Sequence, residues 1–486
     1  MFNKKFSVGS RAPAGMRLPC VVVFASAALT LTAPDRAGAQ EKRLAARGVT
    51  AISATSAAAN DSLAAFLVLA GNVNPSVKAA RDLASAARAR VRPAGARPDP
   101  LLMLGAINVP IRSLNFSEDD MTMKMIGIGQ NIPYPGKLGL RRRIAELQAV
   151  AAEASADSAR LGIVRDTKIS WYELEYMNAA LDVARRKAAV LTGIAGVATA
   201  RYSTGAGMQQ DVLRATLEAT RLNESANALV EEKAAITARI NEMLDRPTEM
   251  QVSKPVVSTA LLRAAIDLGS STRFTSRDLG ASVAGSPFPP IAELQALALE
   301  RNPNLRAKAT MVLVSEAELE LARKEHLPDI DVSLQYGQRS GYMTAGDGSR
   351  TSRSDMISAV VSIPIPIQRK NKQAAEVAAT RATASSVLSD QKAAQNQTRA
   401  EVARLYSDIS HQRTLLALFV KSVIPQGRAT VASAMANYQA GRGDLTTLLA
   451  AQAAVFDLEL GYERALADFA QKVAELEAVV GKELIS

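Results

Sequence analysis

An internal repeat constrains the fold of this 486-residue chain more than any other feature of its sequence. The segment Asn-Pro-Ser-Val-Lys-Ala at 74–79 recurs as Asn-Pro-Asn-Leu-Arg-Ala at 302–307, and the glycine-containing segment at 202–207 recurs at 438–443. Segments that recur in the same order at a nearly constant offset indicate two copies of one structural unit. We therefore predict a first repeat at 62–246, a connector at 247–287 and a second repeat at 288–482.

The N-terminal segment has the three parts of a secretory signal peptide. Basic residues (Lys4, Lys5, Arg11 and Arg17) precede an apolar run at 21–31, and Ala-Gly-Ala follows at 37–39. This pattern predicts a signal peptide at 1–39, cleaved after Ala39. The following Ala/Ser/Thr-rich stretch at 40–61 is predicted to be a flexible lead-in. Cys20 precedes the apolar run instead of following it, which argues against a lipid anchor.

The charge of the chain needs correction for this segment. The full chain carries +11, but residues 1–39 contain five basic residues and one acidic residue, so the mature chain carries +7. These charges are scattered, and no basic stripe is interleaved with aromatic residues. Such a pattern is typical of a solvated surface, so no nucleic-acid partner is predicted.

Long helices are predicted in both repeats. Residues 137–200 contain no proline, and a helix of this length would extend about 95 Å. Later in the first repeat, apolar or small residues recur at steps of three and four, which is typical of a coiled-coil seam. The seam consists of Val212, Ala215, Ala219, Leu222, Ala226, Leu229, Ile236, Ile240 and Met243, and the same phase continues 236 residues later. The low aromatic content of 4% fits closely packed helices.

Each repeat also contains two strand-like segments. Polar and apolar residues alternate at 329–336, and a second segment follows at 355–363; the first repeat offers 101–109 and 121–132. Their lengths suit strands that cross a bilayer, and no run of about 18 apolar residues predicts a membrane-spanning helix. Four strands cannot close in lipid, because an open sheet edge would leave backbone groups unpaired. Two chains would give eight strands with a filled interior, whereas three would give twelve strands and a channel.

The sequence therefore predicts a mainly α protein with a membrane β-barrel. Each chain would supply four strands, a homotrimer would close a twelve-stranded barrel, and the long helices would form a coiled-coil tunnel built from two internal repeats.

Residues that could support enzyme chemistry are few. One cysteine and two histidines, His326 and His411, give no metal-ligand spacing. Carboxylates occur in pairs on the predicted long helices, but without a histidine partner they are more typical of a solvated helix face. These are Glu173, Glu175, Asp182, Glu401 and Asp408. We predict no enzyme activity, no catalytic residues, no cofactor and no metal site.

Four methionines cluster on the first strand-like hairpin, Met103, Met121, Met123 and Met125. Thioethers can bind soft ions such as Cu(I), but methionine also commonly fills gaps in apolar packing. The alternation places the odd-numbered members on one face, and whether that face points inward remains open.

The chain resembles the TolC family of outer-membrane efflux proteins, in particular the branch that serves metal and drug efflux pumps. The resemblance covers both repeats. It is strongest at 130–138 (Gln-Asn-Ile-Pro-Tyr-Pro-Gly-Lys-Leu) and along 424–452, which includes the second glycine-containing segment. It implies a trimeric duct located in the outer membrane, with a helical tunnel in the periplasm. It further implies two partners, a periplasmic membrane-fusion adaptor and an inner-membrane efflux transporter.

The glycine-containing segments lie where one long helix must reverse into the next. We expect their glycines to adopt positive φ and their aspartates to complement the dipole of the outgoing helix. The resemblance adds a second role, adaptor docking and gating, and the two roles are compatible. The residues concerned are Arg201, Tyr202, Gly205, Gly207 and Asp211 in the first repeat and Tyr438, Gly441, Arg442, Gly443 and Asp444 in the second.

Three functions are compatible with these observations. The first is the exit duct of a tripartite efflux pump, and the second is the outer-membrane duct of a type I protein secretion system. The third is a soluble secreted coiled-coil protein, for which paired strand segments at matching positions would not be expected. The sequence favours the first.

Overall fold

The computed structural model describes residues 62–485 except 118, 120, 267–287 and 344–349. The predicted signal peptide and lead-in therefore lie outside the described residues, as do parts of the connector and of the loop between the last two strands. The chain divides into a unit Met1–Ala59 and a unit Asn60–Ser486. All described helices and strands belong to the second unit.

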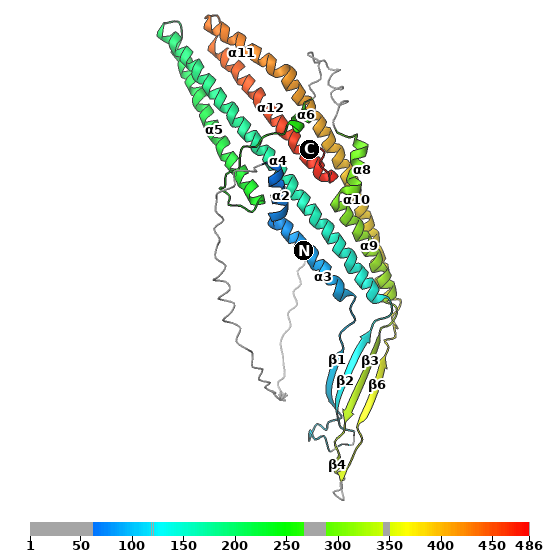
Figure 1. Ribbon diagram of the computed structural model, residues 1–486. Helices are drawn as coiled ribbons and strands as arrows, with labels where there is room; N and C mark the ends of the chain where they lie inside the picture. Colours follow the sequence, from blue (N-terminus) through cyan, green and yellow to red (C-terminus); the bar gives the residue numbers. More distant parts are fainter. Residues whose placement is uncertain (1–61, 118, 120, 267–287, 344–349, 486) are drawn as a thin grey trace, which may run out of the picture. The chain divides into compact units, whose positions relative to one another are not determined.

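The two repeats contain the same order of helices and strands (Figure 1). In the first repeat the helices are α2 (Leu63–Val73), α3 (Pro75–Ala94), α4 (Lys137–Ser203) and α5 (Gln209–Met243). In the second they are α8 (Ile291–Arg301), α9 (Pro303–Lys324), α10 (Gln373–Leu418), the π-helical turn η1 (Phe419–Val423), α11 (Ile424–Gln439) and α12 (Leu445–Val480). The connector contains the short helix α6 (Thr259–Ala265). The prediction of very long helices is confirmed, since α4 has 67 residues and extends about 100 Å.

The repeated Asn-Pro motif ties the start of each repeat to its end. The Asn74 side chain accepts a hydrogen bond from the backbone N–H of Ser76 and donates one of 3.0 Å to the carbonyl of Met243, the last residue of α5. Asn302 caps α9 in the same way and donates to the carbonyl of Val479 near the end of α12. Each asparagine thereby satisfies backbone groups at the ends of two helices that have no partner within their own helix.

The coiled-coil seam is also confirmed. All nine seam positions of α5 are buried or half-buried, and so are the matching positions of α12. The helix that leads to the tip is continuous in the first repeat, where it is α4. In the second repeat the π-helical turn η1 divides it into α10 and α11. Pro425 lies two residues after this turn and cannot donate a backbone hydrogen bond, which is a common cause of such interruptions.

The four predicted strands form one antiparallel sheet in the order β1-β2-β3-β6. Their bounds are β1 (Leu101–Ile107), β2 (Met123–Ile132), β3 (Ile330–Gln338) and β6 (Met356–Ser362). A second, two-stranded ladder joins β4 (Tyr342–Met343) to β5 (Arg350–Thr351) in the connection between β3 and β6. Strands β1 and β6 each pair on one side only, so both edges of the four-stranded sheet are open within the described chain.

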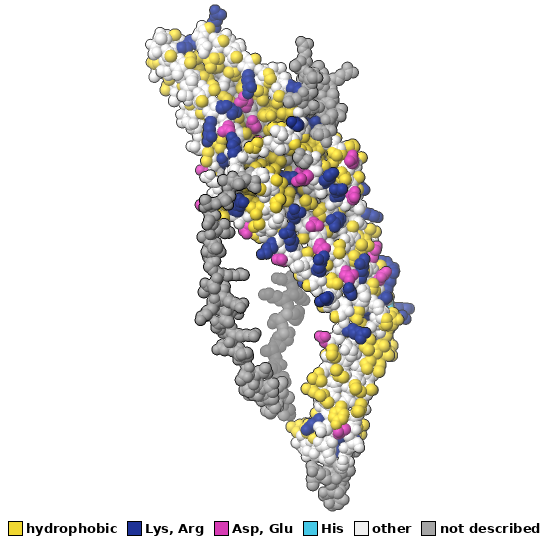
Figure 2. Space-filling view, in the orientation of Figure 1, with side chains coloured by type: hydrophobic (Ala, Val, Ile, Leu, Met, Phe, Trp, Pro, Cys, Tyr) yellow, Lys and Arg dark blue, Asp and Glu magenta, His cyan; other side chains and the backbone are white. Residues whose placement is uncertain are grey.

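The register separates the side chains of this sheet into two different faces. Directly paired residues point the same way, so the rows Leu104–Ile126–Tyr336–Ile357 and Leu102–Ile128–Leu334–Ala359 share one face. Their large side chains are exposed, and Figure 2 shows the apolar surface of the sheet. The opposite face mixes apolar residues (Leu101, Met103, Met123, Met125, Met356 and Val360) with polar ones (Ser333, Gln335 and Ser358). The methionines of the first hairpin thus lie with the polar residues.

An ion pair between a buried lysine and a half-buried aspartate fixes the corner where the sheet meets the helices. Lys137, the first residue of α4, places its Nζ 2.7 Å from an Asp329 carboxylate oxygen and donates to the carbonyl of Leu327. Asp329 also accepts the backbone N–H of Tyr134. These bonds connect the Pro-rich corner of the first repeat to the equivalent Pro-Asp segment of the second.

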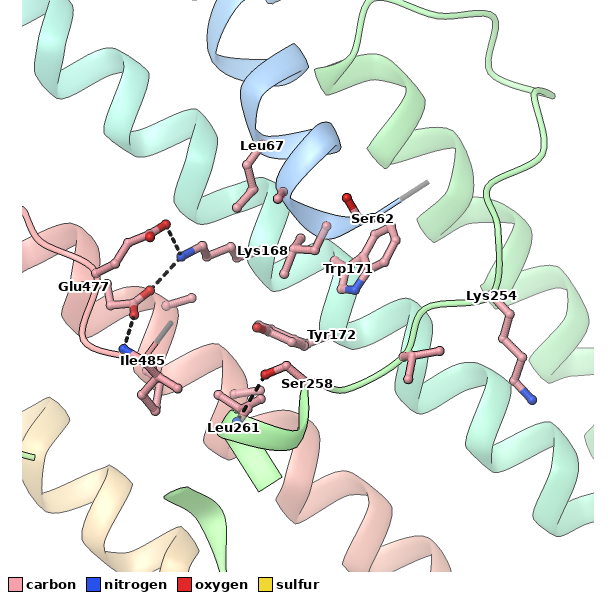
Figure 3. Close-up of a pocket in the computed structure, with 17 residues that line it drawn as sticks. Ser62, Leu67, Lys168, Trp171, Tyr172, Lys254, Ser258, Leu261, Glu477 and Ile485 are labelled. Atoms are coloured by element: carbon pink, nitrogen blue, oxygen red, sulfur yellow. Dashed lines mark hydrogen bonds and ion pairs between the residues drawn. The ribbon is translucent and has the colours of Figure 1, made fainter. Parts of the chain in front are cut away.

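The largest apolar core lies midway along the helices. It joins α2, α4, α6, α8, α10 and α12 and includes Phe66, the single tryptophan Trp171, Leu174, Leu294 and Phe469. At its edge, Figure 3 shows Lys168 pointing toward Glu477 beside a pocket of about 470 Å³. Lys168 Nζ lies 2.7 Å from the Glu477 carboxylate, and both side chains are buried. Glu477 also accepts the backbone N–H groups of Leu484 and Ile485.

Within the described part of the chain, no single helix combines the length and apolar character needed to cross a membrane. Among the described helices, α2 and α3 taken together satisfy this test, as a pair bent by 45°.

Candidate functional site at the helix tips

Both helix hairpins end in the same backbone turn. In the first tip the N–H of Ala206 bonds to the carbonyl of Arg201, and in the second the N–H of Arg442 bonds to the carbonyl of Asn437, each at 2.9 Å. These are the six-to-one bonds of a Schellman motif, which requires a left-handed residue just after the helix. Gly205 and Gly441 supply it, with φ of +74° and +73°.

The prediction of positive φ is wrong for Gly207 and Gly443, which are not among the positive-φ glycines. These two serve a different purpose. A Cβ added to Gly207 would lie 3.0 Å from the Arg201 Cβ and 3.1 Å from the Tyr202 nitrogen, and one on Gly443 would meet Asn437 and Tyr438 equally closely. The outgoing chain thus passes against the last turn of the incoming helix, and a larger residue at either glycine would require that turn to shift by a few tenths of an ångström.

The two aspartates of the tips occupy different positions at the starts of their helices. Asp444 is the N-cap residue of α12, but its side chain makes no capping hydrogen bond. Asp211 lies in the first turn of α5, whose N-cap is Met208. Carboxylates at both positions complement the positive end of a helix dipole, as predicted.

Arg201 connects the two tips within one chain. Its guanidinium donates to the carbonyl of Tyr438 and to that of Ala206, and it stacks over the Tyr438 ring at 4.7 Å from the ring centre. Arg214 adds a second link, a 2.6 Å hydrogen bond to the Thr446 hydroxyl. Sequence reasoning missed Arg214, because no local pattern pairs it with a residue 232 positions away.

A small apolar core supports this contact. It is formed by Leu191, Ile194, Ala215, Tyr438, Leu445 and Leu448, which come from α4, α5, α11 and α12. Tyr438 is only 2% exposed, whereas its counterpart in the first repeat, Tyr202, is 48% exposed. The pKa of the Tyr438 phenol is raised by burial and then by the negative charge of Asp211, against the opposing charge of Arg201.

The structure therefore brings Arg201, Asp211, Tyr438, Gly441 and Asp444 into one neighbourhood. Tyr202 and Arg442 are exposed at the tips and take no part in this contact.

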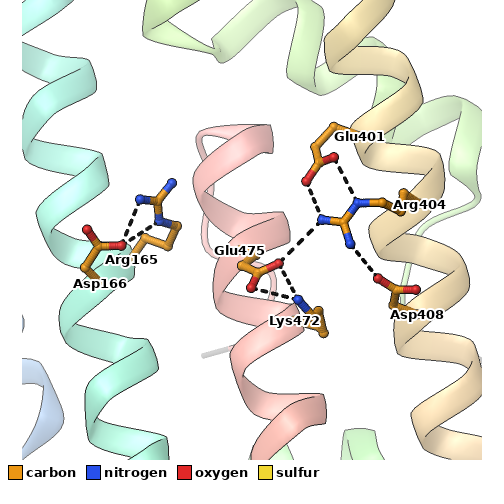
Figure 4. Close-up of polar contacts among 7 residues, drawn as sticks. All are labelled: Arg165, Asp166, Glu401, Arg404, Asp408, Lys472 and Glu475. Carbon is orange, nitrogen blue, oxygen red and sulfur yellow. Dashed lines mark hydrogen bonds and ion pairs between the residues drawn. The ribbon is translucent and has the colours of Figure 1, made fainter. Parts of the chain in front are cut away.

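Four of the five carboxylates considered for acid–base chemistry, all but Glu175, make ion pairs with Arg or Lys. Figure 4 shows Arg404 between Glu401 and Asp408 on α10, with a further contact to Glu475 on α12. Glu173 was expected on a solvated helix face, but it lies against α12, where it accepts hydrogen bonds of 2.7 Å from Arg464 and Gln471. Among the described residues, no group of three or more His, Cys, Asp or Glu side chains could hold a metal ion.

Glu175 gives one prediction about pH. Burial, and after it the negative charge of Glu463, raises the pKa of its carboxyl to about 7, against the opposing charge of Lys254. The folded protein therefore binds this proton more tightly than the unfolded chain, so Glu175 destabilises the fold as the pH rises from about 4.5 to 7. Glu175→Gln should raise the free energy of unfolding at pH 8 by about 1–3 kcal/mol, with no gain at pH 4. Denaturant unfolding at both pH values measures this. Glu224→Gln on the exposed side of α5 is the control, and an equal gain for both variants would contradict the prediction.

The methionines of the first hairpin pack against glycines of the sheet. The Met103 Cε lies 3.3 Å from the position that a Cβ on Gly129 would occupy, and the Met125 Cε lies 3.7 Å from the same position on Gly105. Met123 Sδ lies 2.7 Å from the Cβ position of Gly337. Met121 precedes β2 and does not belong to this row. The contacts favour the packing role over metal binding.

Comparison with known proteins adds to this geometry. The family model described as "Outer membrane efflux protein" matches residues 66–237 and 294–482. No curated protein matches the chain. Among solved structures, the outer-membrane channel OprN is 17% identical, with a TM-score of 0.69 over 87% of this chain and 91% of that one. VceC from Vibrio cholerae is 15% identical with a TM-score of 0.68, covering 87% and 96%. CusC is 13% identical with a TM-score of 0.68, covering 87% and 93%. At these identities the structural likeness shows the fold.

Proposed function

The chain belongs to the outer membrane efflux protein family, and from this premise we propose that it works as a homotrimeric exit duct of a tripartite efflux pump. The protein is located in the outer membrane, and its helical tunnel lies in the periplasm. In the proposed pump, a periplasmic adaptor and an inner-membrane transporter deliver substrates to the tunnel. The duct then passes them to the exterior without transforming them.

The open-edged sheet is the observation that carries this proposal. Its edges β1 and β6 need partners, because unpaired backbone groups are costly in lipid. One face is apolar and exposed, as lipid contact requires, and the other mixes methionines and other apolar residues with glycines and the polar Ser333, Gln335 and Ser358, which could face a water-filled interior. Pairing β6 of one copy with β1 of the next would close a barrel, and three copies would enclose a channel of twelve strands.

The helix tips are the proposed docking and gating end. Exposed Tyr202 and Arg442 would be available to the adaptor, while the Arg201–Tyr438 contact would hold the two hairpins of a chain together. Backbone turns at both tips present the same shape, which suits repeated contacts with a partner.

Gel migration of the purified protein and current recordings in planar bilayers test whether it forms a trimeric duct. We expect a trimer that migrates more slowly on a gel before heating than the monomer does after heating, and stepwise single-channel conductance. A monomer that conducts no current would contradict the proposal. Growth of a deletion strain on copper, cobalt and drug gradients then distinguishes an efflux duct from a protein-secretion duct, since only loss of the former should lower resistance.

The tip glycines test the docking role. Valine at both Gly205 and Gly441 would force a β-branched residue into positive φ, at roughly 1–3 kcal/mol for each position. We expect the double variant to assemble as a normal trimer while efflux falls about tenfold, because a 1.4 kcal/mol loss in adaptor binding is a factor of ten. Gly193→Val combined with Gly196→Val is the control, since an added Cβ at either position meets no atom within 4 Å. Undiminished efflux by the tip variant would remove the docking role and leave the duct intact.

A further inference from the structure

The corner between β6 and α10 exposes three isoleucines in close succession. Ile365 is 80% exposed and Ile367 90%, and Ile363 before them is also exposed. They continue the odd-numbered apolar positions of β6, Ile357 and Val361, past the end of the strand. The apolar face of the sheet therefore extends onto the corner, where it would meet the boundary between lipid tails and headgroups.

Basic side chains follow these isoleucines directly. Arg369, Lys370 and Lys372 are exposed, and none of them has an ion pair or side-chain hydrogen bond within the described part of the chain. More cations without such partners lie where α3 and α9 end beside the sheet: Arg90, Arg92, Arg97, Arg323 and Lys324. We call these eight residues the basic collar. Figure 2 shows Lys and Arg side chains gathered where the helices meet the sheet.

Acidic residues near the corner offset the collar only in part, because Asp99 and Glu376 are outnumbered by its eight cations and three further carboxylates have other partners. Asp329 binds Lys137, Asp331 accepts from Asn131, and Glu325 lies 3.9 Å from Arg141. The local charge that remains is positive.

A cavity of about 570 Å³ lies at the same corner. Ile365, Ile367, Lys372, His326 and Gln373 are among its lining residues. The His326 Nδ1 and the Gln373 Oε1 are buried and have no hydrogen-bond partner in the described chain. The cavity thus combines an apolar rim, two polar atoms that lack partners, and charged residues of both signs, of which the carboxylates of Glu325, Asp329 and Asp331 already have partners in the chain.

We propose that this corner, with Arg369, Lys370 and Lys372, binds the headgroup of an anionic phospholipid from the periplasmic leaflet of the outer membrane. The isoleucines would lie among the acyl chains, the three cations would face the phosphate, and headgroup hydroxyls would reach His326 and Gln373. Exposed apolar residues beside a basic cluster favour an anionic lipid surface. The proposal rests on the proposed function, since the sheet must cross the bilayer for the corner to reach this depth.

Native mass spectrometry of the purified full-length protein, titrated with phosphatidylglycerol or phosphatidylethanolamine, tests it. We expect the wild-type protein to retain phosphatidylglycerol preferentially. Arg369→Gln/Lys370→Gln/Lys372→Gln should weaken that binding on the order of a hundredfold, because each cation near an anionic surface contributes about a factor of five. Arg369→Lys/Lys370→Arg/Lys372→Arg keeps the charges and should retain the lipid.

Arg239→Gln/Arg301→Gln/Lys392→Gln removes three exposed cations away from the corner and is the matched control. Equal retention of the two lipids by the wild-type protein would overturn the proposal. So would unchanged phosphatidylglycerol binding by the corner variant, as expected if a second copy of the chain covers the corner. Conductance in bilayers of phosphatidylethanolamine alone separates the two proposals, because the corner variant should still conduct there, whereas a chain that is no duct would not.

Discussion

Lys168→Met is expected to lower the free energy of unfolding by roughly 3–5 kcal/mol, because it leaves the buried Glu477 carboxylate without its cation. The loss should be large for a second reason, since Glu477 also holds the backbone N–H groups of Leu484 and Ile485 near the C-terminus. Trp171 lies in the adjoining core and is the only tryptophan, so its fluorescence reports the transition. Denaturant unfolding at one fixed protein concentration gives the measurement, since oligomers make stability concentration-dependent.

Two further variants separate charge burial from a general effect of the substitution. Lys168→Met combined with Glu477→Gln removes both charges while keeping an acceptor for the C-terminal N–H groups, and should recover most of the loss. Lys472→Met removes one partner of a more exposed pair on α12 and should cost no more than about 1 kcal/mol. A double variant as unstable as Lys168→Met would show that the lysine acts through packing and not through its charge.

Arg201→Ala is expected to raise the open probability of the channel about tenfold or more. The substitution removes a charged hydrogen bond to the Tyr438 carbonyl, which contributes about 1.5–3 kcal/mol, and a cation–π contact of about 0.5–1 kcal/mol. Arg201 is only half-buried, so the effect should lie toward the lower end. Single-channel recordings of the reconstituted protein measure it, and they rest on the proposed gating role of the tips.

Tyr438→Phe is the control for this experiment. It keeps the ring under Arg201 and the backbone carbonyl, and removes a hydroxyl that has no hydrogen-bond partner in the described chain. We expect it to leave the open probability close to that of the wild-type protein. If Arg201→Ala closes the channel further or leaves it unchanged, the contact does not hold the tips shut.

Periodicity in the sequence predicted the parts of the fold that depend on regular spacing. The seam of α5, the length of α4 and all four strands follow from steps of three and four or of two, because burial acts on one face of each element. The positions of the tips were predicted from the same periodicity, since Gly205 and Gly441 interrupt two long helical patterns at equivalent positions.

Contacts between residues far apart in the sequence could not be predicted. Nothing local marks Lys168 as the partner of Glu477, or Arg201 as the partner of Tyr438, because these pairs depend on how α4 packs against α12 and α11. The distinct roles of the tip glycines were hidden for a related reason. A glycine required by positive φ and one required by close approach look the same in a sequence, and only the path of the neighbouring chain distinguishes Gly205 from Gly207.

The two tips of a chain have the same backbone conformation but different side chains. Position 201 is arginine where its counterpart, 437, is asparagine, and of the two equivalent tyrosines one is buried and the other exposed. In the proposed trimer, six hairpins would form a ring that is close to sixfold in outline and only threefold in its side chains. A partner that recognises only the backbone shape of the tips would find six equivalent binding sites. A partner that recognises the arginine, the tyrosine or their contact would find three. The binding stoichiometry of a partner would therefore reveal which of these surfaces it recognises.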